Sequence, residues 1–249
     1  MSTLWSTPPD PLVLEREEVH VWRATLDLPA YRVQALEQTL APDEGTRAQK
    51  YHFQKDRIHF IVARGLLRAI LARYLDRDAT ALRFTYNEYG KPALVEEAGD
   101  DSLSFNVSHS HGMALHAITR NWAVGIDLEW INKDIEPEQI AGRFFSPYEI
   151  AMLRSVPKEL QRQAFFDCWT RKEAYIKARG MGLSLALDQF DVSLVPGLPA
   201  EILANREANQ DIARWSLYEL SPGEDYKAAL AVEGKPVRLQ YWQWSEQKR

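Results

Sequence analysis

Apolar residues follow two different spacings along the first part of the chain. Residues 19–26 have the pattern of a strand, whereas after Pro42 the apolar positions recur every three or four residues. The recurring series is Ile58, Val62, Leu66, Ile70 and Tyr74. This spacing places the series on one face and predicts a long amphipathic helix that ends near Leu75. The other face of that helix carries Arg57, Arg64, Arg68 and Arg73.

Strand patterns dominate residues 84–130. Short apolar stretches are separated there by turns that contain glycine or proline, such as Gly90-Lys91-Pro92 and Gly112. The predicted strands are Phe84–Asn87, Leu103–Val107, Met113–Thr119 and Trp122–Glu129.

Helical patterns return after residue 145. The string Ser146-Pro147-Tyr148-Glu149 has the form of a capping box and predicts a helix start. A second helix is predicted over residues 160–179, and Gly180 should end it because glycine readily adopts the left-handed conformation. From Phe190 to Trp244 the pattern is again that of strands with polar turns.

This order of elements predicts an α+β fold in which one unit is traversed twice. The joint falls near Asn121, so we divide the chain into an N-terminal half, residues 1–120, and a C-terminal half, residues 121–249. If one unit is traversed twice, we expect the two halves to have similar folds.

Composition narrows the functional classes. The 249 residues include 30 Lys and Arg against 35 Asp and Glu, and a formal charge of −5 excludes a bulk nucleic-acid coat. A hydrophobic content of 45% is typical of a globular chain. The single cysteine, Cys168, can form neither an internal disulfide nor a cysteine metal cage, which favours a reducing compartment. No apolar run is long enough for a membrane helix and the first ten residues lack a leader pattern, so we expect a cytoplasmic protein that binds neither membrane nor nucleic acid.

Two carboxylates lie on one face of the strand that ends at Glu129. Because side chains alternate along a strand, Val124, Ile126 and Leu128 should face the core while Gly125, Asp127 and Glu129 point the other way. Like charges ~7 Å apart repel by roughly 2 kcal/mol at an effective dielectric of 20. A divalent cation such as Mg²⁺ would remove that repulsion. An exposed strand face that carries two acids is the alternative.

The helix over residues 160–179 aligns Trp169, Glu173 and Lys177 in one stripe, since they are four residues apart. Glu173 and Lys177 form either an ordinary surface ion pair or a third metal carboxylate beside a phosphate-binding lysine. Two turns add further polar groups. One, Tyr89-Gly90-Lys91-Pro92, is by the turn rules alone a surface turn with a solvated lysine. Ser108-His109 ends a strand, and because neighbouring strand residues face opposite sides they are badly placed for a hydrolase triad but suited to binding phosphate.

Taken together and in this order, these strings resemble the 4′-phosphopantetheinyl transferases of the Sfp type. The similarity covers about Val19 to Tyr226. Its hallmarks are Gly125-Ile126-Asp127-Leu128-Glu129 and, some forty residues later, the segment from Trp169 to Lys177. The turn at Gly90-Lys91-Pro92 and the strand end from Phe105 to Ser110 match the family as well.

The resemblance implies a pseudo-two-fold arrangement of two similar halves with the active site between them. It also implies a role for each matching residue. Asp127, Glu129 and Glu173 would hold a Mg²⁺ that also binds the diphosphate of coenzyme A, and Lys177 and Lys172 would neutralise the same phosphates. Asp127, Glu173 and Lys177 are therefore the expected catalytic residues.

The remaining matches concern the adenosine end of coenzyme A. Ser108 and His109 correspond to residues that bind the 3′-phosphate, and Tyr89, Gly90 and Lys91 to the turn beside the adenine. Lys55 and Arg64 match further cations on the long first helix. His59 occupies a position where relatives often carry arginine, and a neutral imidazole is a weaker phosphate ligand than a guanidinium.

By the same resemblance, the expected reaction is attack by a serine hydroxyl of an apo acyl or peptidyl carrier protein on the β-phosphorus of coenzyme A, which leaves 3′,5′-ADP. Such phosphoryl transfer depends mainly on positioning and charge neutralisation. The serine proton would pass to Glu173 or to a metal-bound water. We expect a monomer whose partners are coenzyme A and the carrier.

Two other functions remain open at this point. One is a coenzyme A-binding protein without activity, and the other is a metal-dependent phosphodiesterase that acts on the holo-carrier. Residues near the metal strings that could contact a carrier are Arg143, Phe144, Phe145 and Met181, although plain core and surface roles suit them equally. The carrier and its pathway do not follow from the sequence.

Overall fold

The computed structural model describes residues 4–95, 102–207 and 212–245. The helices are α1 (Ala30–Glu37), α2 (Pro42–Gln49), α3 (Gln54–Leu75), α4 (Pro137–Phe144), α5 (Pro147–Ser155) and α6 (Lys158–Arg179). The strands are β1 (Glu18–Thr25), β2 (Phe84–Tyr86), β3 (Pro92–Leu94), β4 (Leu103–Ser110), β5 (Met113–Arg120), β6 (Val124–Trp130), β7 (Phe190–Val192), β8 (Ile202–Asn205), β9 (Trp215–Leu220), β10 (Tyr226–Glu233) and β11 (Arg238–Gln243). The predicted α+β class is confirmed.

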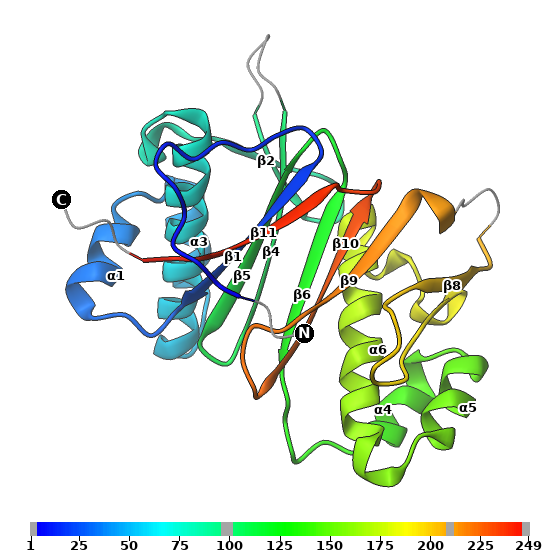
Figure 1. The fold of residues 1–249 in the computed structure, drawn as a ribbon. Coiled ribbons are helices and arrows are strands. Elements are labelled where there is room, and N and C mark those ends of the chain that lie inside the picture. Colours follow the sequence, from blue (N-terminus) through cyan, green and yellow to red (C-terminus); the bar gives the residue numbers. More distant parts are fainter. Residues whose placement is uncertain (1–3, 96–101, 208–211, 246–249) are drawn as a thin grey trace.

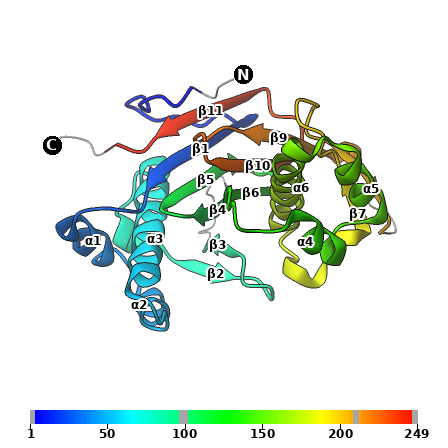
Figure 2. The ribbon, with the colours of Figure 1, turned by 90° about the horizontal axis from the view of Figure 1, so that it is seen from below.

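Two sheets form the centre of the fold, and the two long helices lie on opposite sides of them (Figures 1 and 2). One sheet has the order β11-β1-β5-β4 and the other β6-β10-β9. Short two-stranded sheets, β2-β3 and β7-β8, are attached to them. Each of the two larger sheets packs against one long helix, α3 in one case and α6 in the other.

Alternation along the strands builds the layers. Val19 and Val21 of β1 pack with Val124, Ile126 and Leu128 of β6 in a cluster between the sheets. The intervening residues of each sheet face its own long helix, so Trp22 and Ile118 pack with α3. The prediction that the three apolar residues of β6 face the core is confirmed.

Helix α3 covers the N-terminal sheet with the predicted apolar face, but its other face is not simply solvated. Arg64 and Arg68 are 8% and 0% exposed. Both pair with the buried carboxylate of Glu44 on α2, at 2.8 Å from the Nε of Arg64 and 2.7 Å from that of Arg68. The spacing of apolar residues did not reveal helix α2. Two of the four arginines can be buried because Glu44 of this helix supplies their counter-charge.

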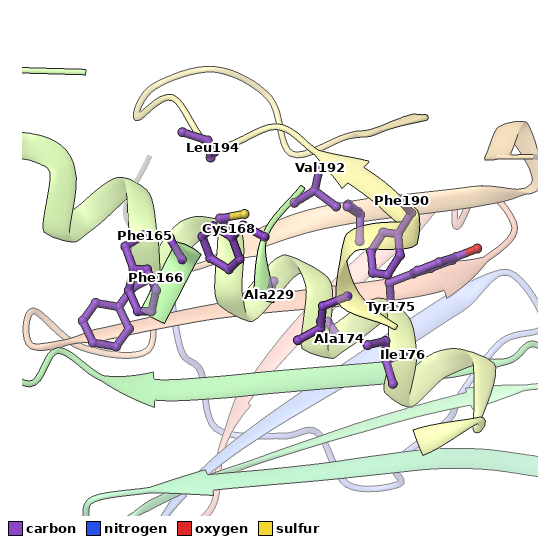
Figure 3. Close-up of a cluster of buried hydrophobic side chains, with 14 of the residues drawn as sticks. Phe165, Phe166, Cys168, Ala174, Tyr175, Ile176, Phe190, Val192, Leu194 and Ala229 are labelled. Carbon is purple, nitrogen blue, oxygen red and sulfur yellow. The ribbon is translucent and has the colours of Figure 1, made fainter. Parts of the chain in front are cut away.

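The C-terminal half has its own core around α6. Tyr175 and Phe190 pack edge to face with ring centroids 4.9 Å apart, and Cys168 is buried in the same cluster (Figure 3). The capping box predicted at Ser146 is confirmed, with Ser146 Oγ accepting from the backbone N–H of Glu149 at 3.2 Å. Gly180 ends α6 in the left-handed conformation with φ of 67°, also as predicted.

The last strand leaves the C-terminal half. β11 pairs in parallel with β1, with Val19 opposite Leu239, and so lies at the edge of the N-terminal sheet (Figure 2). The boundary at residue 121 remains a prediction, but the two halves share strands rather than standing as separate units. In the described part of the chain no helix is both long and apolar enough to cross a membrane.

At Gly125, β6 lies directly against the backbone of α6. A Cβ at this position would lie 2.1 Å from the carbonyl oxygen of Ala174 and 2.2 Å from the backbone nitrogen of Ala178. Backbone atoms of a helix cannot move aside as a flexible side chain can. Only glycine fits here, and the pairing of β6 with α6 depends on it.

We expect Gly125→Ala to lower the free energy of unfolding by at least about 3 kcal/mol, because the strand and helix must separate to admit the methyl group. Gly142→Ala is the matched control, since no atom lies within 4 Å of a Cβ there. That change should stabilise α4 by up to about 1 kcal/mol. Urea denaturation of both variants checks this, and equal stabilities of Gly125→Ala and wild type would contradict the packing argument.

His116 of β5 is a buried neutral base. It is 0% exposed, and its Nε2–H donates to the carbonyl of Ala63 at 3.3 Å. Burial lowers the pKa of His116 from 6.5 to about 4. Between these two values the unfolded chain binds a proton that the folded chain does not, so the stability falls as the pH falls.

We expect this histidine alone to remove roughly 3 kcal/mol of stability between pH 6.5 and pH 4. His116→Gln keeps a donor for Ala63 but does not titrate, and should flatten the dependence of the unfolding free energy on pH over that interval. Urea denaturation from pH 4 to pH 7.5 measures it. An unchanged slope in the variant would show that His116 is not the titrating group.

Candidate active site

The two sheets meet where β4 runs beside β6, and side chains rather than backbone groups join them. The carbonyl Oδ1 of Asn106 accepts from the N–H of Ile126 at 2.9 Å. Two steps further along β4, Ser108 Oγ accepts from Leu128 N–H at 3.2 Å. Ser110 Oγ accepts from Trp130 N–H in the same way, at 3.1 Å. The strand end that includes Ser108 therefore holds the halves together in regular register.

Ser108 also touches the first predicted metal carboxylate. Its hydroxyl donates to Asp127 Oδ1 at 3.0 Å, and the ammonium of Lys177 lies 2.5 Å from the same oxygen and 3.1 Å from Ser108 Oγ. Asp127 is only 2% exposed, whereas the side chain of Lys177 is 29% exposed. The three residues come from β4, β6 and α6, so the site spans both halves of the chain.

The charge of Asp127 acts on the other two carboxylates, Glu129 and Glu173. Burial, reinforced by the charges of Asp127 and Glu173, raises the pKa of Glu129 to about 7, although Ser110 Oγ donates to it at 3.1 Å. Burial and the charge of Asp127 also raise the pKa of Glu173. Both pKa values are raised because the carboxylates are partly buried and lie close to one another. A divalent cation bound among them would lower the pKa values again.

We tested whether this group suits Mg²⁺. No set of three or more His, Cys, Asp or Glu side chains within the described ranges is arranged to hold a metal ion. In this structure the ammonium of Lys177 supplies the positive charge next to Asp127. The donor chemistry nevertheless fits, because all three groups offer carboxylate oxygens and Asp127 Oδ2 is buried without a hydrogen-bond partner among the described residues.

Two adjoining cavities run along the junction of the halves. One, of about 280 Å³, is lined by the turn at Tyr89, Gly90 and Lys91 and by Glu173 and Lys177 of α6. The other, of about 190 Å³, is lined by α2 and α3 side chains together with His109. They share four lining residues, Gly90, Pro92, Asn106 and Val107, and so form one cleft.

The smaller cavity contains groups that the sequence did not single out. Arg47 of α2 and Tyr86 of β2 line it beside Arg64 and His109. The hydroxyl of Tyr86 accepts from the Arg64 guanidinium. Arg47 lies before the apolar series and belongs to none of the motifs, so no signal in the sequence pointed to it. Tyr86, by contrast, lies only three residues before the Tyr89 turn and could have been suspected from that position.

Lys172 does not reach the cleft, contrary to what the resemblance implied. It is fully buried, and its ammonium is bound by Glu149 at 2.8 Å and by the carbonyls of Leu187 and Phe190 at 2.6 and 2.5 Å. These partners use all three of its donors. The reason is helical geometry: residues five apart, such as Lys172 and Lys177, point in different directions. We therefore do not include Lys172 in the site.

Two other residues of α3, the expected cation Lys55 and the neutral imidazole of His59, lie outside the cavities. Lys55 is exposed on the first turn of α3 and does not line either cavity. His59 is buried, with Nε2 3.0 Å from Asp27 Oδ1, and is likewise not a lining residue.

Of the carrier-contact candidates, Phe145 is 4% exposed and belongs to the core, whereas Phe144 is 43% exposed.

Chemically, the cleft has Glu173 and Lys177 in its wall at one end, where Lys177 pairs with Asp127, and arginine, histidine and tyrosine groups at the other. A ligand with two separate anionic parts would match this distribution, the nearer part through a divalent cation. Burial and the charge of Asp127 raise the pKa of Glu173, which makes it a stronger base than an ordinary carboxylate.

The comparisons with known proteins point to one family. A family model described as 4′-phosphopantetheinyl transferase superfamily matches residues 123–231, and another, described as 4′-phosphopantetheinyl transferase, N-terminal, matches residues 26–119. The 4′-phosphopantetheinyl transferase HetI of Nostoc sp. is 39% identical over 240 residues, which is 96% of this chain and 98% of the relative.

More distant relatives align over shorter stretches. The 4′-phosphopantetheinyl transferase Sfp of Bacillus subtilis is 34% identical over 78% of this chain and 82% of its own length. A crystal structure of Thermotoga maritima holo-[acyl-carrier-protein] synthase is 21% identical and covers 45% of this chain and 63% of its own, with a TM-score of 0.35, which is too low for a comparison of folds. The match to HetI extends over nearly the whole of both chains. On that basis, this chain belongs to the 4′-phosphopantetheinyl transferase family.

Proposed function

We propose that this transferase moves the 4′-phosphopantetheine group of coenzyme A to a serine of an apo acyl or peptidyl carrier protein, with Mg²⁺ as the metal and 3′,5′-ADP as the other product. The observation that carries the proposal is the convergence of Asp127, Ser108 and Lys177 from three elements at one end of the cleft. We propose further that it acts as a cytoplasmic monomer on a soluble carrier.

Asp127, Glu129 and Glu173 would hold the metal. When bound, Mg²⁺ neutralises charge on the diphosphate and on the departing 3′,5′-ADP. The unpartnered Oδ2 of Asp127 and the raised pKa values of Glu129 and Glu173 support this assignment, since each indicates a carboxylate short of positive charge.

Lys177 serves the same diphosphate directly. Its ammonium lies beside Asp127 at the wall of the larger cavity, and its partial exposure leaves room for a phosphate oxygen to approach. A lysine in a partly dehydrated cleft stabilises developing phosphate charge more strongly than it would in water. Because Ser108 and Asp127 hold the ammonium, little rearrangement is needed when the phosphate binds.

Glu173 is the proposed proton acceptor. It lines the larger cavity, whereas Glu129 does not, so its carboxylate is placed to take the proton of the carrier serine. The hydroxyl oxygen would then attack the β-phosphorus in line with the leaving phosphate.

The adenosine end of coenzyme A would occupy the smaller cavity. His109 at the rim and Arg47 and Arg64 in its wall supply hydrogen-bond donors and positive charge for the 3′-phosphate. Ser108 is buried and already bonded to Asp127, Leu128 and Lys177. We therefore assign the 3′-phosphate to His109 rather than to Ser108.

The reaction itself is the first test. Purified protein, coenzyme A and Mg²⁺ should add one phosphopantetheine mass to an apo carrier protein, measured by intact-protein mass spectrometry, and EDTA should abolish the addition. A carrier whose acceptor serine is alanine is the control. If none of several carriers gains mass with metal present, the proposal is wrong. Loss of pantetheine from holo-carrier would instead indicate a phosphodiesterase, and coenzyme A binding without turnover an inactive binding protein.

Asp127→Asn tests the carboxylate cluster. The amide keeps the size of the side chain and an oxygen for Lys177, but it removes the charge. We expect kcat to fall by about 10²-fold or more and the Mg²⁺ concentration for half-maximal rate to rise. Asp134→Asn is the matched control, because Asp134 is an exposed aspartate shortly after β6. Equal rates for the two variants would exclude Asp127 from the reaction.

A further inference from the structure

The turn between β2 and β3 reaches across to the other half of the chain. Asn87 organises it: its Oδ1 accepts from the N–H groups of Tyr89 and Lys91 at 3.0 and 2.8 Å, and Gly90 adopts φ of 82°. The amide Nδ2 of Asn87 then donates to the carbonyl of Gly180 at 2.7 Å. One side chain thus shapes the turn and attaches it to the end of α6.

Lys91 makes the second attachment. Its ammonium donates to the carbonyls of Lys177 at 2.7 Å, Ala178 at 3.0 Å and Val124 at 3.0 Å. All three donors therefore go to the backbone of the C-terminal half. Carbonyls in the last turn of a helix lack partners within the helix and carry partial negative charge, so this cation caps α6.

Lys91 binds both elements that carry the site residues, β6 through Val124 and α6 through Lys177. Val124 begins β6 three residues before Asp127, and Lys177 is the residue whose ammonium touches Asp127. Lys91 binds the backbone of each. Burial also lowers the pKa of Lys91 to about 8, as expected where carbonyl dipoles and no carboxylate solvate the charge.

We propose that Lys91 is a positioning residue that fixes the end of α6 against β6, so that Lys177 is held over Asp127, rather than a direct ligand of coenzyme A. This rests on the proposed function, because Lys177 must act on the diphosphate for its placement to affect the rate. The N-terminal half would then contribute to catalysis through the helix of the C-terminal half as well as by binding adenosine.

Steady-state kinetics of Lys91→Met on the apo carrier separates the two roles. A displaced Lys177 should lower kcat by up to ~10²-fold, since small misplacements near the reacting groups are costly. The KM for coenzyme A should change by less than about threefold, whereas loss of a direct phosphate ligand raises KM. A raised KM with unchanged kcat, or unchanged kinetics altogether, would overturn the proposal.

Two further variants protect the test. Asn87→Ala removes the hydrogen bond to Gly180 and should lower kcat, though less than Lys91→Met does. This variant remains a test if Lys91→Met fails to fold, and a normal kcat in Asn87→Ala would count against the proposal. In a Lys177→Met background, Lys91→Met should have little further effect on kcat, because both changes act through one group. Additive losses would contradict this. Wild-type protein that modifies no carrier would instead refute the proposed function.

Discussion

The site depends on the contact between β6 and α6 at Gly125. Here strand and helix approach until a single methyl group would overlap helix backbone atoms. This closeness brings Asp127, two residues further along β6, within reach of Lys177, one helical turn after Ala174.

Charge placement, and not total charge, determines what this acidic chain can bind. Several cations serve the fold: buried Arg68 neutralises Glu44, buried Lys172 neutralises Glu149, and half-buried Lys91 caps α6. The cations left to face the cleft are few. They lie at opposite ends of it, with Lys177 beside the carboxylates and Arg47 and Arg64 in the smaller cavity. A net charge of −5 therefore coexists with a cleft suited to a polyanion once its carboxylates are neutralised.

The side-chain bonds between β4 and β6 give one sequence string two functions. Asn106, Ser108 and Ser110 alternate along β4 and bind alternate N–H groups of β6, which joins the sheets without backbone pairing. Ser108 and Ser110 also donate to Asp127 and Glu129. The junction of the halves and the orientation of the carboxylates are thus fixed by the same hydroxyl groups. Asn87 and Lys91 of the β2–β3 turn join the halves at a second place, through hydrogen bonds to backbone carbonyls at the end of α6.

The sequence by itself determined the α+β class, the two long helices, the helix caps and the carboxylates on one face of β6, because these follow from local periodicity and backbone preference. It also supplied the strings that mark the family. Tertiary structure alone decided which cations face the cleft, since Lys172 and Arg68 acquire buried counter-charges from distant segments, Glu149 and Glu44. It likewise placed β11 beside β1 and Lys91 on the end of α6. Such partners are brought together by long-range packing, which no local spacing of residues records.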